Sequence, residues 1–146
     1  MTRPPSVALR QRLARARDLV EVRYDEALTV PVLAGVAGLS PFHFVRSFRA
    51  AYGLTPHDYL TRVRIDRARE RLAMGASVTE TCLDVGFSSL GSFSTLFRRQ
   101  IGCSPSAYQR AVRPVVQVAA DLPRLVIPHC FLRLYTMIPD SLPTCP

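Results

Sequence analysis

Arginine and phenylalanine recur along one short stretch, LSPFHFVRSFRAAYGLTP, residues 39–56. A guanidinium group is a planar, permanently charged fork that binds carboxylates, phosphates or the edge of a guanine base. On a helix, Phe44 and Phe48 would share one face, and Phe42 and Arg46 would share the opposite one. Phenylalanines four residues apart are typical of packing. The spacing therefore predicts a packed phenylalanine face and an outward face that binds an external partner.

Patterns for catalysis or metal binding are sparse. The cysteines form no C-x-x-C pair, and a zinc site that joined them to His129 would lack finger or ribbon spacing. They are Cys82, Cys103, Cys130 and Cys145. Only the tripeptide PHC, residues 128–130, puts a cysteine beside a histidine, and no general acid and base pair is evident. We predict free thiols in a reducing cytosol, no metal, no cofactor and no enzyme, with a thiol enzyme acting on nucleic acid as an alternative.

The charge balance is strongly basic. The formal net charge is +8, all 19 basic residues are arginine, and the pI is near 10.2. This favours a polyanionic partner, nucleic acid before an anionic membrane. Residues 27–45 carry no formal charge, but two prolines and two glycines interrupt them, so they predict two short packed helices instead of a membrane span. Residues 1–13 lack the pattern of a signal peptide, which predicts a cytoplasmic location.

The chain repeats itself. At a separation of 49 residues, the positions Phe44, Phe48, Arg49, Gly53, Pro56 and Tyr59 recur as Phe93, Phe97, Arg98, Gly102, Pro105 and Tyr108. At a separation of 48, Val30 and Gly38 recur as Val78 and Gly86. Each unit reads as a helix, a glycine turn and a second helix, which predicts two helix-turn-helix units. The second helices are expected to bury their phenylalanines on one face together with Ala51 and Gln100.

Helix signals dominate before residue 114, so we predict an all-α fold. A first helix over about residues 7–24 has an apolar stripe, formed by Leu9, Leu13, Ala16 and Val20. Proline directly after a serine or threonine N-cap marks three helix starts, at Ser40, Thr55 and Ser104. Two further starts are marked by Thr29 and by the capping-box sequence SVTE, residues 77–80.

A polar-faced linker helix, residues 56–74, separates the units. At 1.5 Å per residue it spans roughly 28 Å, enough to hold the units about one turn of duplex DNA apart. Its acidic residues, Asp66 and Glu70, are expected to pair with arginines such as Arg62 or Arg69. The predicted organisation is a first helix-turn-helix subdomain at 1–54, the linker helix at 55–75, a second subdomain at 76–113 and an irregular, proline-rich extension at 114–146.

The outward residues of the two second helices are candidates for DNA contact, because that helix enters the major groove in a helix-turn-helix protein. Arg46 is the predicted base reader, since arginine can form a bidentate pair with guanine, and Phe42 and Val45 are predicted apolar contacts. The second unit presents methyl and hydroxyl groups and no forked donor, so we expect it to discriminate only weakly between base pairs. Its candidate contacts are Leu90, Gly91, Ser94 and Thr95. Arginines further along the helices are predicted phosphate contacts: Arg49, Arg98 and Arg99.

The stretch RIDRARERLAMGASVTETCLDVGFSSLGSFSTLFRRQIGCSPSAYQRAV, residues 64–112, resembles the DNA-binding region of AraC/XylS-type bacterial transcription regulators. The matching features are R-I-x-x-A, a V-G-F turn, F-x-x-x-F and G-x-x-P. The resemblance extends over about residues 7–113. It implies two helix-turn-helix subdomains, a linker helix, and recognition helices in successive major-groove segments on one side of bent DNA. The base-contact positions given above are also those that the resemblance implies.

Many members of that family carry an effector-binding and dimerisation domain before this region. Only six residues precede the first predicted helix here, so the chain is expected to lack such a pocket and to act as a monomer or weak dimer. The expected partner is double-stranded DNA, with RNA polymerase as a second, and no membrane. A protein-interaction module is the alternative from another class.

The extension at 114–146 has no predicted function. It is apolar, with six prolines in 33 residues, and the preferred interpretation is a strap packed over the second subdomain. The alternatives are a dimer contact, a polymerase contact, or a thiol or metal sensor through His129 and Cys130.

Overall fold

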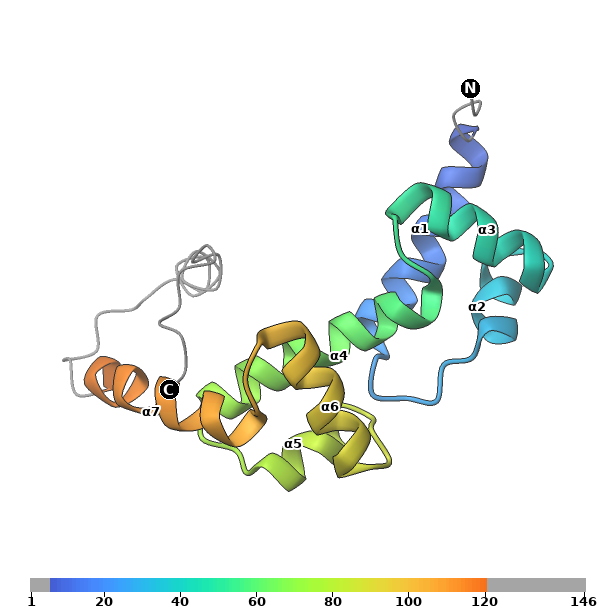
Figure 1. Ribbon diagram of the computed structural model, residues 1–146. Helices are drawn as coiled ribbons and strands as arrows, with labels where there is room; N and C mark the ends of the chain where they lie inside the picture. The colour runs from blue at the N-terminus through green and yellow to red at the C-terminus, as the bar shows by residue number, and fades with distance from the viewer. Residues whose placement is uncertain (1–5, 121–146) are drawn as a thin grey trace.

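A computed structural model describes the backbone of residues 6–120 and the side chains of residues 6–112. Within this range the chain is helical without a strand, which confirms the predicted all-α fold (Figure 1). The helices are α1 (Val7–Val22), α2 (Val30–Ala37), α3 (Pro41–Tyr52), α4 (Pro56–Ala73), α5 (Val78–Asp84), α6 (Leu90–Ile101) and α7 (Pro105–Ala120). Helix α7 continues past residue 113, and the predicted strap lies mostly outside the described residues. No described helix is long and apolar enough to cross a membrane.

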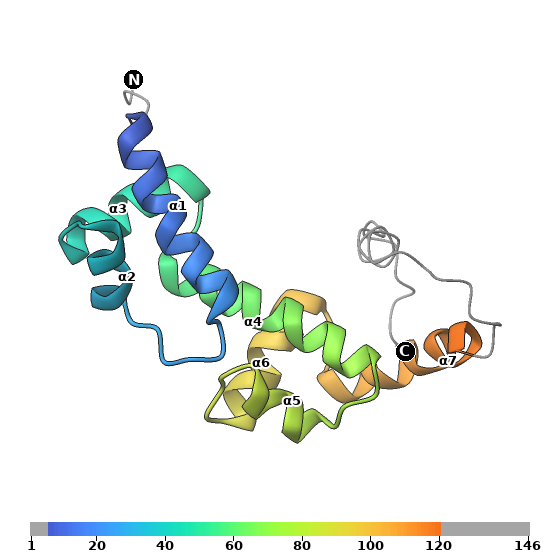
Figure 2. The ribbon, with the colours of Figure 1, turned by 180° about the vertical axis from the view of Figure 1, so that it is seen from behind.

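Helix α4 joins two groups of helices, as the views from both sides show (Figures 1 and 2). Each group has its own hydrophobic core. Its first half contributes Leu60 and Val63 to a core shared with α1, α2 and α3. Its second half contributes Ile65, Ala68 and Leu72 to a core shared with α5, α6 and α7. The predicted arrangement of two helix-turn-helix units about a linker helix is therefore confirmed.

The repeated phenylalanines are fully buried, as predicted. In the first core the ring centroids of Phe44 and Phe48 are 5.4 Å apart, and the Tyr59 ring of α4 meets Phe48 edge-on at 5.6 Å. In the second core the corresponding distances are 5.7 Å and 5.6 Å, for Phe93 to Phe97 and for Phe97 to Tyr108. Each core is thus closed by a tyrosine from the helix that follows the unit, which explains why tyrosine is part of the repeat.

One part of the predicted core face was wrong. Ala51 and Gln100 are exposed, and the buried stripes continue instead to Tyr52 and Ile101, which are half-buried against the two cores. In the first unit the reason is the position of α4, because Tyr59 packs on the same side of α3 as Tyr52, with ring centroids 6.2 Å apart.

The repeat begins earlier than the sequence analysis found. The segment RLARAR, residues 12–17, recurs as RIDRAR, residues 64–69, at a separation of 52. Its buried positions match in the structure: Leu13, Ala16 and Val20 in α1 correspond to Ile65, Ala68 and Leu72 in α4. Each unit is therefore three helices, α1–α3 and α4–α6. The change of separation from 52 to 48 between the first and second helices hid this part of the duplication.

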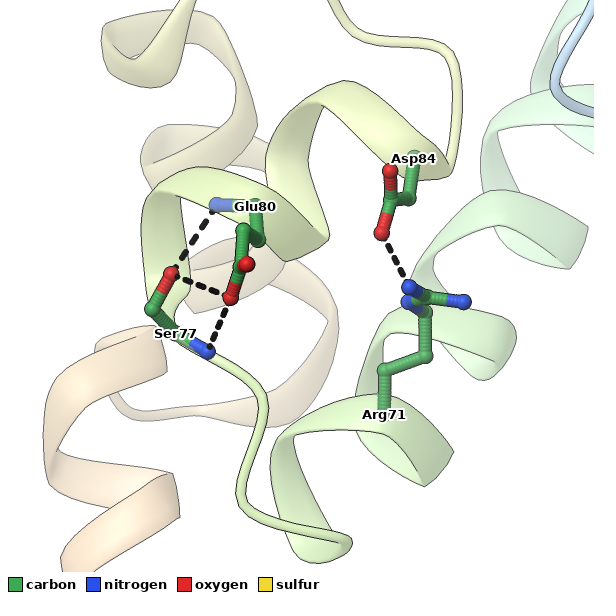
Figure 3. Close-up of polar contacts among 4 residues, drawn as sticks. All are labelled: Arg71, Ser77, Glu80 and Asp84. Carbon is green, nitrogen blue, oxygen red and sulfur yellow. Dashed lines mark hydrogen bonds and ion pairs between the residues drawn. The ribbon is translucent and has the colours of Figure 1, made fainter.

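The capping predictions hold with one exception. The hydroxyls of Ser40, Thr55 and Ser104 each accept a bond from the backbone N–H three residues later. Ser77 and Glu80 form the predicted capping box, and Arg71 of α4 pairs with Asp84 at the end of α5 (Figure 3). Thr29 occupies the N-cap position of α2, but its side chain makes no capping bond.

Proline at the second position of α2 does not account for the exception. Pro31 has no N–H to offer, but the caps that form all accept from the third backbone N–H of their helices. In α2 that third residue is Val32, which has an N–H.

We expect Ser77→Ala to lower the free energy of unfolding by about 1 kcal/mol, because it removes a formed cap. The matched change Thr29→Ala is expected to cost only a few tenths of a kcal/mol, since it removes no bond. Urea denaturation followed by far-ultraviolet circular dichroism measures both. Equal losses would show that Thr29 caps α2 in solution.

Candidate nucleic-acid interface

The predicted base contacts of α3 lie on its outward face. The Phe42 side chain is 74% exposed, and the Arg46 guanidinium carbon lies 5.8 Å from the centre of its ring. Arg49 is exposed one turn further along. Val45 differs from these residues, because it is half-buried and packs against the first core. The structure thus brings Phe42 and Arg46 together as one exposed apolar and cationic pair.

The outward face of α6 is flatter. Gly91 and Thr95 are exposed, Ser94 is half-buried, and Leu90 at the start of the helix is 46% exposed. Because Gly91 has no side chain, the backbone itself forms the surface at that position. This face can approach a partner closely, but it has no forked donor in its first two turns.

Charge is distributed unevenly among the arginines. Neither α3 nor α6 contains an acidic residue. Among residues 6–112, ion pairs with carboxylates engage arginines of α1, α4 and the α1–α2 connection, namely Arg17, Arg23, Arg67, Arg69 and Arg71. The exposed arginines of the two second helices take part in none of these pairs: Arg46, Arg49, Arg98 and Arg99. Their charge is therefore available to an external anion.

A cleft of about 360 Å³ lies between α4 and the end of α6. Its lining residues are Leu54, Asp58, Thr61, Arg62, Arg99 and Gln100. The cleft brings Arg62 of the linker helix beside the predicted phosphate contact Arg99. The sequence predicts Arg62 only as a partner for linker carboxylates, because nothing in the linear pattern distinguishes it from its neighbours. In the structure the ion pair of Asp66 is with Arg69, at 3.9 Å.

Two cysteines, Cys82 and Cys103, lie among the described residues. Cys82 is buried, and desolvation raises the pKa of its thiol, which favours the unreactive protonated form. Cys103 is half-buried against the second core. No cluster of potential metal ligands occurs among the described residues. The thiol or metal sensor given as an alternative would use His129 and Cys130, and the zinc site considered and not predicted would also need His129; these two residues lie outside the described residues.

Two three-helix units, each with an exposed third helix (α3 or α6) free of acidic residues, define a tandem helix-turn-helix protein. Residues 33–111, more than half of the chain, match the model of a family described as a helix-turn-helix domain. With the relatives given below, this shows that the chain belongs to the AraC-type helix-turn-helix family.

Three relatives illustrate the match. The probable transcriptional regulator LumQ of Photobacterium leiognathi is 37% identical over 98 residues, covering 64% of this chain and 38% of LumQ. A probable AraC family transcriptional regulator from Rhodopseudomonas palustris is 28% identical with a TM-score of 0.66, covering 71% of this chain and 99% of that structure. The DNA-binding domain of AdpA, solved with a target DNA, is 34% identical with a TM-score of 0.63, covering 75% and 96%. The chain spans little more than a third of the length of LumQ.

Proposed function

We propose that this chain is a sequence-specific transcription regulator that binds double-stranded DNA, with α3 and α6 in successive major-groove segments. The observation that carries the proposal is the segregation of charge. Among the described residues, the ion pairs with carboxylates all involve arginines of α1, the α1–α2 connection or α4. None involves the arginines of α3 or α6, which are exposed on helices without acidic residues. Membership of the family, and the structure of the AdpA domain with its target DNA, support the same partner.

In this proposal the two helices have unequal roles. Arg46 reads a guanine through its forked donors, and the exposed ring of Phe42 contacts a neighbouring thymine methyl. Val45 adds an apolar contact with the part of its side chain that the core leaves accessible. The residues of α6 fit a shallow contact with little base discrimination: Leu90, Gly91, Ser94 and Thr95.

Phosphate contacts extend beyond the recognition helices. Arg49, Arg98 and Arg99 lie near the ends of α3 and α6, where arginine commonly grips the DNA backbone. Arg62 joins them in our proposal, because it shares the cleft with Arg99 and places a second cation there.

The length of α4 agrees with this arrangement. Its 18 residues correspond to about 27 Å at the rise of an α-helix. One turn of duplex DNA is about 34 Å, so units at the two ends of α4 can reach successive major-groove segments. Contact with RNA polymerase and a monomeric or weakly dimeric state remain predictions.

Selection from a random pool of duplexes of about 40 bp, at near-physiological salt, tests the proposal. The expected result is one strongly enriched motif, read by α3, and a weaker second motif about 10 bp away. Absence of any enriched sequence would contradict sequence-specific binding and favour the protein-interaction alternative.

The salt dependence of binding tests the phosphate contacts separately. We expect Arg99→Ala to reduce the slope of log affinity against log salt concentration by about one unit, because each neutralised phosphate releases about one counterion. Arg23→Ala removes the same charge from a position paired with Glu26 and is expected to leave the slope unchanged. A slope equal in the wild type and in Arg99→Ala would exclude a phosphate contact by Arg99.

A further inference from the structure

We infer that Arg64 is a positioning residue that locks the two helix-turn-helix units together and so fixes the spacing between the two DNA segments that α3 and α6 contact. The part concerning DNA rests on the proposed function. The part concerning the protein rests on the Arg64 guanidinium group of α4, which contacts two further segments of the chain, one in each unit.

The first segment is the connection between α1 and α2, in the first unit. Arg64 of α4 donates from Nε to the carbonyl of Tyr24 at 2.7 Å and from Nη2 to the carbonyl of Glu26 at 2.8 Å. Two donors of one rigid fork thus hold two carbonyls of the same short connection. Such a pair of bonds fixes direction as well as distance.

The second segment is the turn between α5 and α6, in the second unit. The Arg64 guanidinium carbon lies 5.5 Å from the centre of the Phe87 ring. Gly86 has a φ of +86°, and a Cβ built there would lie 2.5 Å from the Asp25 carbonyl oxygen and 3.0 Å from Arg64 Nη2. The turn therefore rests directly against the α1–α2 connection, and glycine is the residue that permits this approach.

The duplication shows what is particular about this arginine. Arg12 holds the corresponding position in the first unit, where it donates from Nε to Ala37 at 2.6 Å and from Nη2 to Gly38. Both of those bonds stay within the first unit, at its own helix-turn-helix turn. Arg64 also lies against the turn of its unit, but its bonds cross to the other one. Arginine occupies the same position of both units, but Arg12 stabilises the turn of its own unit, whereas Arg64 links the second unit to the first.

Neighbouring groups reinforce the junction. The half-buried Tyr24 packs against both cores, and the Arg67 guanidinium carbon lies 5.7 Å from the centre of its ring. Partial burial lowers the pKa of Arg64, with the Asp25 charge opposing the shift, and arginine stays charged at neutral pH.

The shared helix alone does not fix the relative position of the units. A continuous α4 sets their separation along its axis, but a helix can bend gently and its units can tilt about it. The bonds of Arg64 lie to the side of α4 and oppose such a tilt. A displacement of α6 relative to α3 changes which base pairs the two helices can contact at the same time. Loss of the Arg64 bonds should therefore weaken the preference for one spacing between the two DNA motifs.

The experiment compares the wild-type chain with Arg64→Met and, as the matched control, Arg12→Met. Each change keeps an unbranched stem and removes two arginine–carbonyl bonds, but only the first removes bonds between the units. The DNA set is the selected duplex, versions with one or two base pairs inserted or deleted between its motifs, and a duplex with the α3 motif alone. The distance between spin labels at the exposed positions Ala50 and Ser92, carried on non-natural side chains, is measured without DNA.

For the wild type we expect a narrow distance distribution and at least a tenfold loss of affinity at altered spacings. For Arg64→Met we expect a broad distance distribution and affinities that differ by no more than about threefold between the duplexes of different spacing. Its affinity for the α3 motif alone should equal that of the wild type. Arg12→Met should keep the narrow distribution and the wild-type spacing preference.

Two results would overturn the inference: a distribution for Arg64→Met as narrow as that of the wild type, or a wild-type spacing preference despite a broadened distribution. An equal loss on the single motif would reduce Arg64 to a residue that stabilises one unit. Failure of every protein to bind DNA specifically would instead contradict the proposed function, and the label distances would still decide whether Arg64 holds the units together.

Discussion

Replacing Arg46 with alanine should weaken binding to the selected DNA by about 1–3 kcal/mol, roughly 5- to 150-fold, and binding to random DNA much less. Arg46 is exposed on α3, no carboxylate pairs with it among residues 6–112, and it lies against the exposed Phe42 ring. A bidentate pair with guanine uses forked donors that Phe42 and Val45 lack, and the other arginine of that face, Arg49, lies one turn further along α3. Competition binding with the selected duplex and with random duplexes of equal length measures the two losses.

Two further variants separate base reading from charge. Arg46→Lys keeps the charge but lacks the planar fork, so it should lose most of the preference for the selected duplex while binding random DNA nearly normally. Arg49→Ala should weaken both kinds of binding by similar factors, as expected for a phosphate contact. If Arg46→Ala also lowers both equally, Arg46 grips the backbone and the base reader lies elsewhere on α3.

Local patterns explain why much of this fold was predictable. A serine or threonine before proline sets a helix start through bonds three residues away, and Ser40, Thr55 and Ser104 all behave as predicted. The phenylalanine repeat predicted both cores, because a buried stripe is a property of one helix. Thr29 takes the N-cap position of α2 without a capping bond, and its residue type does not distinguish it from Thr55, which forms one.

The junction at Arg64 was not predictable in the same way. Its acceptors are backbone carbonyls about 40 positions earlier in the chain, and a backbone carbonyl leaves no trace in residue type. The same holds for Arg62, whose place beside Arg99 depends on how α6 packs against α4. Exposure of most candidate DNA contacts followed from helical periodicity. The partial burial of Val45 and Ser94, which hold the same position in the repeat, was not predicted.

Gly86→Ala should be the most destabilising single-methyl change at a described glycine, with a loss of about 3 kcal/mol in the free energy of unfolding. The left-handed φ of +86° disfavours any side chain, and the new Cβ would also lie 2.5 Å from the Asp25 carbonyl oxygen. Backbone of the α1–α2 connection would have to move to relieve that contact. The movement would also strain the bonds of Arg64 to the carbonyls on either side of Asp25.

Gly102→Ala separates the cost of backbone strain at positive φ from the cost of the contact with the Asp25 carbonyl oxygen. Gly102 has a similar φ of +91°, but among the described residues no atom beyond its chain neighbours lies within 4 Å of its Cβ position, so alanine there should cost about 1 kcal/mol from backbone strain alone. Urea denaturation of both variants and the wild type gives the difference, expected near 2 kcal/mol, which reports the cost of separating the turn from the α1–α2 connection. Equal losses at the two glycines would mean that this connection yields freely, and that the two units are not held in one fixed arrangement.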